Sequence, residues 1–182
     1  MLSHPGAARR NRLPVLLGSV LAVGLLAVVG AWVYGVYAMS APERGLLVGL
    51  RIDGSRVTVK APTCPTDTVG TVEVFDSETT EPLWRASDPT TQAGKRGELT
   101  LWDAAGFARP GPQPQPARLP DRLDVAVEYG VGEHGGGPDG SGDVFDTAEA
   151  AAAGLPEGQY WTDDGPMTAA AIDGQLRCGS AG

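Results

Sequence analysis

Oxygen-bearing side chains gather in one glycine-rich segment, residues 130–146. Within it, Asp139, Ser141 and Asp143 have the alternate spacing that opens the calcium loop of an EF-hand. The rest of that pattern is missing, because Val144 stands where the loop needs its sharp-turn glycine and no bidentate glutamate follows at the required distance. We therefore predict a solvated loop without a bound metal, with calcium binding in an irregular geometry as the alternative.

The same segment contains His134, the one histidine after residue 40 and the natural candidate for a general base. Catalysis needs rigid elements to hold a nucleophile, a base and an orienting group together, and a glycine-rich loop does not provide them. The motifs GxSxG, SxxK and HExxH do not occur in the sequence. Carboxylates such as Glu73, Asp124 and Glu128 are expected to solvate the outer face of a sheet. The sequence thus predicts a protein that is not an enzyme and that uses no cofactor.

Two cysteines, Cys64 and Cys178, are the other residues that could do chemistry. In an oxidising compartment an isolated pair of this kind most simply forms a structural disulfide. A redox pair would need a CxxC-like arrangement or an activated thiolate, and the sequence indicates neither. We predict a Cys64–Cys178 disulfide that ties the end of the second strand to the C-terminal region. In the chain-entropy model a loop of this length contributes about 4–5 kcal/mol.

Three tryptophans, Trp84, Trp102 and Trp161, separate two interpretations. If they line an open cleft, they indicate a ligand-binding receptor or an enzyme with an unfamiliar site. If they lie in the core or on strand faces, an interaction module is the better interpretation. We expect the second arrangement, because large aromatic side chains are mostly buried.

Alternating apolar and polar residues place most of these side chains on strands. The clearest run is residues 123–129, and Asp53-Gly54 predicts a hairpin turn between two other runs. The alternating segments are 46–52, 57–59, 72–74, 99–101 and 123–129, with shorter strands around 83–84 and 160–161. About seven strands with one apolar face each predict a mainly β fold, an antiparallel β-sandwich of immunoglobulin-like architecture. The Cys-Trp-Cys spacing of antibody domains does not occur, so the prediction concerns architecture and not a family.

One short helix is predicted for the same region, at residues 147–153. Its alanines favour helix, Asp146 or Thr147 can cap its start, and a glycine follows it. Another turn is expected at 167–172, where Thr168 can cap.

A proline-rich stretch, residues 110–120, cannot join a central strand. Such stretches can serve as ligands for aromatic grooves. Because this one interrupts a predicted domain, we interpret it as a stiff connection between strands.

The run from Leu13 to Met39 has no charged residue and is long enough to cross a bilayer as one helix. Pro14 suits the first turn of that helix. Aromatic residues at the far end, Trp32, Tyr34 and Tyr37, are then expected at the outer headgroup layer.

Three arginines, Arg9, Arg10 and Arg12, precede this run and predict a cytoplasmic N-terminus. The expected organisation is a basic cytoplasmic segment, a transmembrane helix, a short linker and an extracytoplasmic β domain, at residues 1–12, 13–39, 40–45 and 46–182. The alternative is a secreted protein with a signal peptide cleaved after Ser40. The apolar run exceeds the 7–15 residues usual for a signal peptide, which favours a retained anchor.

Charge is divided unevenly along the chain. The first 40 residues contain three arginines and no acidic residue, whereas eleven basic and all 22 acidic residues follow, for a net charge near −11. A domain of this charge repels nucleic acid and anionic lipid, so nucleic-acid binding is not expected.

The expected protein is therefore a single-pass, membrane-anchored module at the plasma membrane, a non-catalytic accessory or interaction protein of the bacterial cell envelope. Its lipid partner is the bilayer around the N-terminal helix. A protein embedded in the same membrane is the kind of partner that the short linker suits. The competing interpretations are a ligand-binding receptor or an envelope enzyme with an unrecognised site.

Overall fold

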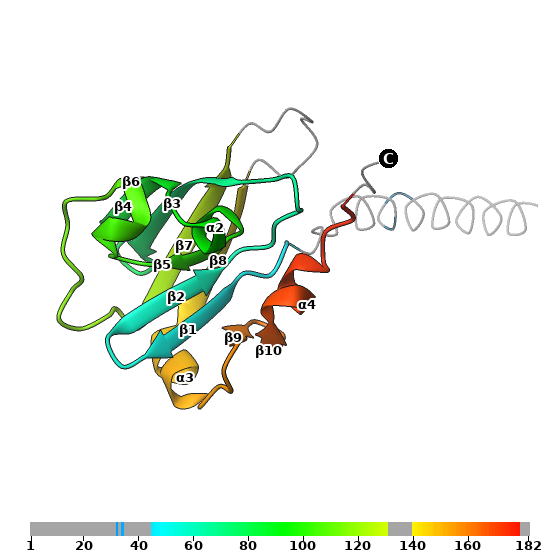
Figure 1. The fold of residues 1–182 in the computed structure, drawn as a ribbon. Coiled ribbons are helices and arrows are strands. Elements are labelled where there is room, and N and C mark those ends of the chain that lie inside the picture. The colour runs from blue at the N-terminus through cyan, green and yellow to red at the C-terminus, as the bar shows by residue number, and fades with distance from the viewer. Residues whose placement is uncertain (1–31, 33, 35–44, 131–139, 179–182) are drawn as a thin grey trace, which may run out of the picture. The chain divides into compact units, whose positions relative to one another are not determined.

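A computed structural model of the chain describes residues 32, 34, 45–130 and 140–178. The chain divides after Arg44, and the unit that follows, Gly45–Gly182, contains two five-stranded antiparallel sheets (Figure 1). Sheet A has the order β10 (Gly165–Thr168), β9 (Gln159–Thr162), β1 (Gly49–Asp53), β2 (Arg56–Lys60) and β5 (Glu98–Thr100). Sheet B has the order β6 (Phe107–Arg109), β4 (Pro82–Pro89), β3 (Val69–Asp76), β7 (Arg122–Tyr129) and β8 (Gly140–Asp146). The predicted mainly β fold is confirmed.

Sheet A is built around the predicted hairpin of β1 and β2. Gly54 in its turn has a φ of 60°, a left-handed conformation that glycine adopts without steric cost. Leu50 of β1 is paired with Val59 of β2, which is paired with Leu99 of β5. All three side chains are buried, so this row forms part of the inner face of the sheet.

Sheet B follows the alternation that predicted β3 and β7. Val72 is paired with Val127, and Val74 with Val125, and all four side chains are buried. The inner faces of the two sheets supply one continuous hydrophobic core, which includes Trp84. The period-two pattern therefore fixes which face of each strand is covered.

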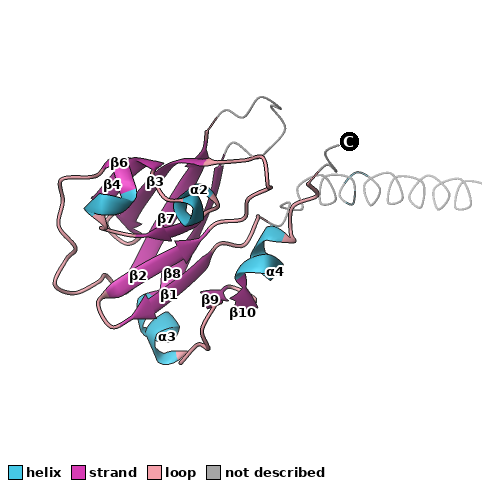
Figure 2. Cartoon of the chain, in the orientation of Figure 1, coloured by secondary structure: helices cyan, strands magenta, loops and turns pink. Residues whose placement is uncertain are grey.

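Among the described residues after Gly45, helices are short and lie at the margins of the sandwich (Figure 2). The predicted helix is confirmed as α3 (Thr147–Ala152) with Asp146 as its cap, and the predicted turn forms α4 (Ala169–Asp173) with Thr168 as its cap. The expectation of a single short helix is wrong, because α2 (Gln92–Lys95) and the 3-10 helix η1 (Ala104–Gly106) are also present. Both are single turns started by the side chains of Thr91 and Asp103, and turns of this length leave no apolar period to detect.

The glycine-rich segment also needs a correction. Residues 140–146 are not loop: they form β8, which pairs with β7 from Gly140↔Glu128 to Asp146↔Arg122. Two glycines in this strand have no side chains, so the sequence does not show an alternation of apolar and polar residues. The strand conformation is stabilised instead by pairing with β7. The preceding residues 131–139 lie outside the described part of the chain.

The predicted membrane span also lies outside the described part, apart from Trp32 and Tyr34, which are helical and exposed. Among the described residues, no helix combines the length and the apolar character needed to cross a membrane.

Candidate functional site

Trp84, Trp102 and Trp161 lie in different environments. Their positions decide whether they belong to the core or line a cleft. Trp84 is 2% exposed, and its ring packs edge-on against Phe107, with ring centres 5.4 Å apart. Trp102 lies 6.0 Å from Trp84 and is partly buried against the same core. Both are core residues, as expected. Trp161 is partly buried as well, but it also lines a groove at the edge of the sandwich.

Trp102 has a strained backbone, with a φ of 58° in the left-handed region that bulky residues avoid. Its Nε1 is buried and has no hydrogen-bond partner among the described residues. The proline-rich loop lies close to the neighbouring ring, because a Cβ at Gly111 would be 2.8 Å from Trp84 Cδ1 and 2.4 Å from the carbonyl oxygen of Arg85. This close approach supports the interpretation of residues 110–120 as a connection packed on the sandwich.

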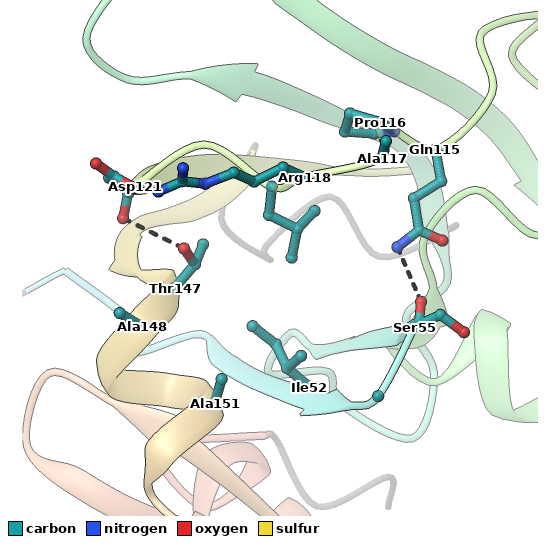
Figure 3. Close-up of a pocket in the computed structure, with 12 residues that line it drawn as sticks. Ile52, Ser55, Gln115, Pro116, Ala117, Arg118, Asp121, Thr147, Ala148 and Ala151 are labelled. Carbon is teal, nitrogen blue, oxygen red and sulfur yellow. Dashed lines mark hydrogen bonds and ion pairs between the residues drawn. The ribbon is translucent and has the colours of Figure 1, made fainter.

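A groove of about 660 Å³ lies at one end of the sandwich (Figure 3). One wall is the proline-rich loop, the second is the β1–β2 turn and the third is α3. Apolar side chains from all three walls line it: Ile52, Pro116, Ala117, Leu119, Ala148 and Ala151. The lining polar residues are Ser55, Gln115, Arg118, Asp121 and Thr147.

Hydrogen bonds across this groove join its walls. Gln115 Nε2 donates to the carbonyl oxygen of Ser55 at 2.8 Å, and Thr147 Oγ1 donates to the carbonyl oxygen of Pro120 at 2.8 Å. Arg118 and Asp121 form an exposed ion pair at 3.3 Å. These polar groups hold the loop in place, and the remaining lining of the groove is largely apolar.

A second groove, of about 290 Å³, lies beside β8. Its lining residues are Arg122, Val144, Phe145, Asp146, Glu149, Trp161 and Asp163. Its lining thus includes three carboxylates, one guanidinium and a partly buried indole. The sequence alone did not indicate this site, because its members come from three separate segments and share no spacing.

The described residues of the glycine-rich segment, Gly130 and 140–146, bring no metal ligands together. Ser141 and Asp143 share the inner face of β8, where the Ser141 hydroxyl lies 2.8 Å from the Tyr129 hydroxyl and Asp143 accepts the Val144 N–H at 2.9 Å. Among the described residues, no group of three His, Cys, Asp or Glu side chains could hold a metal ion. Asp139 and His134 lie outside the described part, so the predictions made for them stay predictions.

The carboxylates predicted to solvate a sheet are on the outer face of sheet B. Glu73 pairs with Arg85 at 2.7 Å, and Glu128 is exposed. Asp124 is partly covered, and burial raises the pKa of its carboxyl above the usual value. Asp143, on the inner face, has its pKa raised mainly by burial, with a smaller contribution from the charge of Asp163.

The predicted disulfide is confirmed: Cys64 and Cys178 are bonded, with their Cα atoms 5.5 Å apart. Near it, Lys60 on the outer face of sheet A is 3% exposed. Its Nζ donates to the carbonyl oxygens of Ala61 and Arg96 at 2.9 and 2.8 Å and forms an ion pair with Asp173. Alternation predicts an exposed lysine here, and its burial is caused by α4, which is distant in sequence.

The C-terminal segment is held to sheet A by one further residue. Gln175 accepts a hydrogen bond from the Leu47 N–H at 2.8 Å and donates to the Leu47 carbonyl at 2.9 Å. Space for this covering layer depends on Gly49, where a Cβ would lie 2.5 Å from Tyr160 Cβ and 2.7 Å from Ile172 Cδ1. The disulfide, the buried ion pair and the amide therefore fasten one structural layer.

Comparison of the chain with protein-family models, with curated proteins and with solved structures finds no match.

Proposed function

We propose that this chain is a single-pass membrane protein whose extracytoplasmic β domain is a non-catalytic interaction module of the bacterial cell envelope. The observation that carries the proposal is the Cys64–Cys178 disulfide in the unit that follows the uncharged run 13–39. Structural disulfides form and persist in oxidising compartments, outside the cytoplasm. An apolar run preceded by three arginines orients the following domain to that side.

Several buried or partly buried polar side chains make structural hydrogen bonds, which supports a binding role for the domain. Within the described part, Tyr129, Ser141, Lys60 and Asp173 make hydrogen bonds that hold strands and α4 together. Both grooves are open and lie at the margins of the sandwich, where they are accessible to a macromolecule. Surfaces of this kind suit recognition of a partner more than enclosure of a small substrate.

An immunoglobulin-like arrangement is part of the same proposal. The order β1–β2–β5 corresponds to strands A, B and E of that architecture, and β4–β3–β7–β8 corresponds to C′, C, F and G. Sheet A has β9 and β10 in addition, and sheet B has β6. The disulfide also departs from the inter-sheet bond of antibody domains, since it ties the segment after α4 to the segment after β2.

Membrane topology is tested by labelling single thiols in bacterial spheroplasts. Because Cys64 and Cys178 are paired, Glu78→Cys in the exposed β3–β4 turn gives the full chain one free thiol. We expect a membrane-impermeant maleimide to label this variant in intact spheroplasts. The matched variant Ser3→Cys should be labelled only after permeabilisation. Labelling of Glu78→Cys only after permeabilisation would refute the proposed orientation.

Retention of the anchor is tested on the same material. The intact mass of protein extracted from membranes should include residues 1–40, and the protein should remain with the membrane after alkaline carbonate washing. A mature N-terminus at Ala41 would show that the apolar run is cleaved and that the module is secreted.

A further inference from the structure

β8 is the outermost strand of sheet B and pairs on one side only, with β7, within the described part of the chain. It contains seven residues. The end strands β5 and β6 have three residues each, and β10 has four, of which Pro166 cannot donate a backbone hydrogen bond. β8 therefore offers the longest edge at which another extended chain could be added.

The outward-facing backbone groups of β8 follow from its ladder with β7. Thr147 N–H donates to the carbonyl oxygen of Asp121, which continues that ladder by one residue. In an antiparallel pair, alternate residues face the neighbouring strand, so Gly142, Val144 and Asp146 direct their backbone groups away from β7. The Val144 N–H is covered by the Asp143 carboxylate at 2.9 Å. An incoming strand must displace this carboxylate to reach the Val144 N–H, and a charge placed in this way discourages indiscriminate pairing at a sheet edge.

The groove of about 290 Å³ begins at this edge. Asp146 comes from β8, Glu149 from α3 and Asp163 from the β9–β10 turn, and all three are exposed. Within the described residues, none of these carboxylates takes part in an ion pair. The Trp161 indole, which lines the same groove together with Arg122, presents the kind of surface to which ammonium and guanidinium groups bind.

We propose that β8 and this groove bind an extended, basic segment of a partner protein, which adds a strand to sheet B. Backbone groups of Gly142, Val144 and Asp146 pair with the incoming segment, and its basic side chains enter the groove beside Trp161. The inference rests on the proposed function, because it specifies the partner of the interaction module. The net charge near −11 after residue 40 attracts a basic segment from a distance.

A second copy of the chain is a poorer occupant of the same edge. Antiparallel pairing of two β8 strands around Val144 would place Asp143 of each copy diagonally opposite Asp143 of the other. Like charges on adjacent strands destabilise pairing. The chemistry of the edge therefore favours a partner of opposite charge.

The test uses the full chain in detergent and, as probe, a nine-residue peptide of alternating lysine and valine. Calorimetric titration at low salt should give a dissociation constant in the micromolar to submillimolar range. Glu149→Gln with Asp163→Asn should weaken binding about tenfold, by removing two charges that face the peptide. The matched pair Glu78→Gln with Glu81→Gln, at the exposed β3–β4 turn, lowers the charge equally and should change binding less than about twofold.

The contribution of the strand edge is tested separately with Val144→Pro. Proline at this outward position removes the edge N–H and should abolish peptide binding while the ladder with β7 is kept. Should this variant not fold, the Glu149 and Asp163 substitutions decide, because both side chains are exposed. Any of three results would overturn the docking surface. These are equal weakening of peptide binding by the Glu149/Asp163 and Glu78/Glu81 double variants, unchanged binding by a folded Val144→Pro variant, and no binding up to about 1 mM.

Self-association of the chain that Val144→Pro abolishes would assign the edge to a second copy instead, and it would also overturn the proposal. Peptide binding is measured on purified protein and thiol labelling on spheroplasts. If the peptide does not bind but thiol labelling gives the expected result, the proposal of a membrane-tethered module stands and only the proposed docking surface is rejected.

Discussion

Tyr129 joins three parts of the sandwich through one hydroxyl group. Its oxygen lies 2.7 Å from the carbonyl oxygen of Pro62, to which it donates, and 2.8 Å from the Ser141 hydroxyl. The ring is partly buried against the core, and burial raises the pKa of Tyr129 to about 12. The residue therefore connects β7 to β8 and to the segment after β2, and the bond that it donates to Pro62 requires its neutral form.

Replacement of Tyr129 by phenylalanine should lower the free energy of unfolding by about 1–2 kcal/mol, because a buried carbonyl and a hydroxyl lose their partner. Tyrosine in the unfolded chain has its ordinary pKa of 10, so the folded state binds the proton more tightly. The stabilisation is fully present below pH 10 and is lost as the pH rises towards 12. Urea unfolding at pH 7 and pH 11 checks both points. Tyr34→Phe, at an exposed position, is the control and should change neither value.

In contrast to the Tyr129 hydroxyl, the ionised Asp143 carboxylate should destabilise the folded state. Because burial raises the pKa of its carboxyl, the stability that it contributes is present below the unfolded pKa and is lost as the pH rises through the folded pKa. Asp143→Asn should therefore increase the free energy of unfolding at pH 7, by up to about 1 kcal/mol given solvent screening. The gain should shrink as the pH falls through the folded pKa and should be absent below the unfolded pKa. A variant less stable than the parent protein at pH 7 would contradict this account.

At the scale of elements, α4 is held over sheet A by a buried charge. Removal of Asp173 leaves Lys60 charged and buried, with only two backbone carbonyls as partners. Asp173→Ala should cost about 2 kcal/mol, less than for a fully buried pair because Asp173 is partly exposed. Lys60→Met combined with Asp173→Ala should recover part of this loss. Arg109→Ala breaks the exposed pair with Asp88 and serves as the control, with a loss below about 1 kcal/mol in the same urea unfolding measurement.

Elements predicted from the sequence are those whose own residues carry a pattern. Alternation predicted β3 and β7 because each buries one face against the other sheet over eight residues. β8 was missed because Gly140 and Gly142 have no side chains to alternate, and its pairing with β7 decides the structure. The same limit applies to the groove at Trp161 and to the burial of Lys60, since both require segments that only the fold brings together.

The whole domain combines strong negative charge with a covalent tie. Repulsion among 22 acidic and eleven basic side chains after residue 40 opposes compaction, and the layer fastened by Cys64–Cys178 is distant in sequence from the strand it covers. The disulfide joins residues 114 positions apart, so it restricts the unfolded chain more than any local contact could.

Removal of this disulfide should be the largest single loss of stability in the domain. The chain-entropy model assigns a loop of this size about 4–5 kcal/mol, and measured losses are usually about 2–5 kcal/mol. We expect Cys64→Ala with Cys178→Ala to lower the urea midpoint clearly while the sheets remain folded, because the Lys60–Asp173 pair and Gln175 still hold α4. Adding Asp173→Ala to this variant should release the C-terminal layer, seen as faster hydrogen exchange at Leu47 and in α4 than in β3 and β7. A midpoint unaffected by loss of both cysteines would show that the covalent tie is not what stabilises this layer.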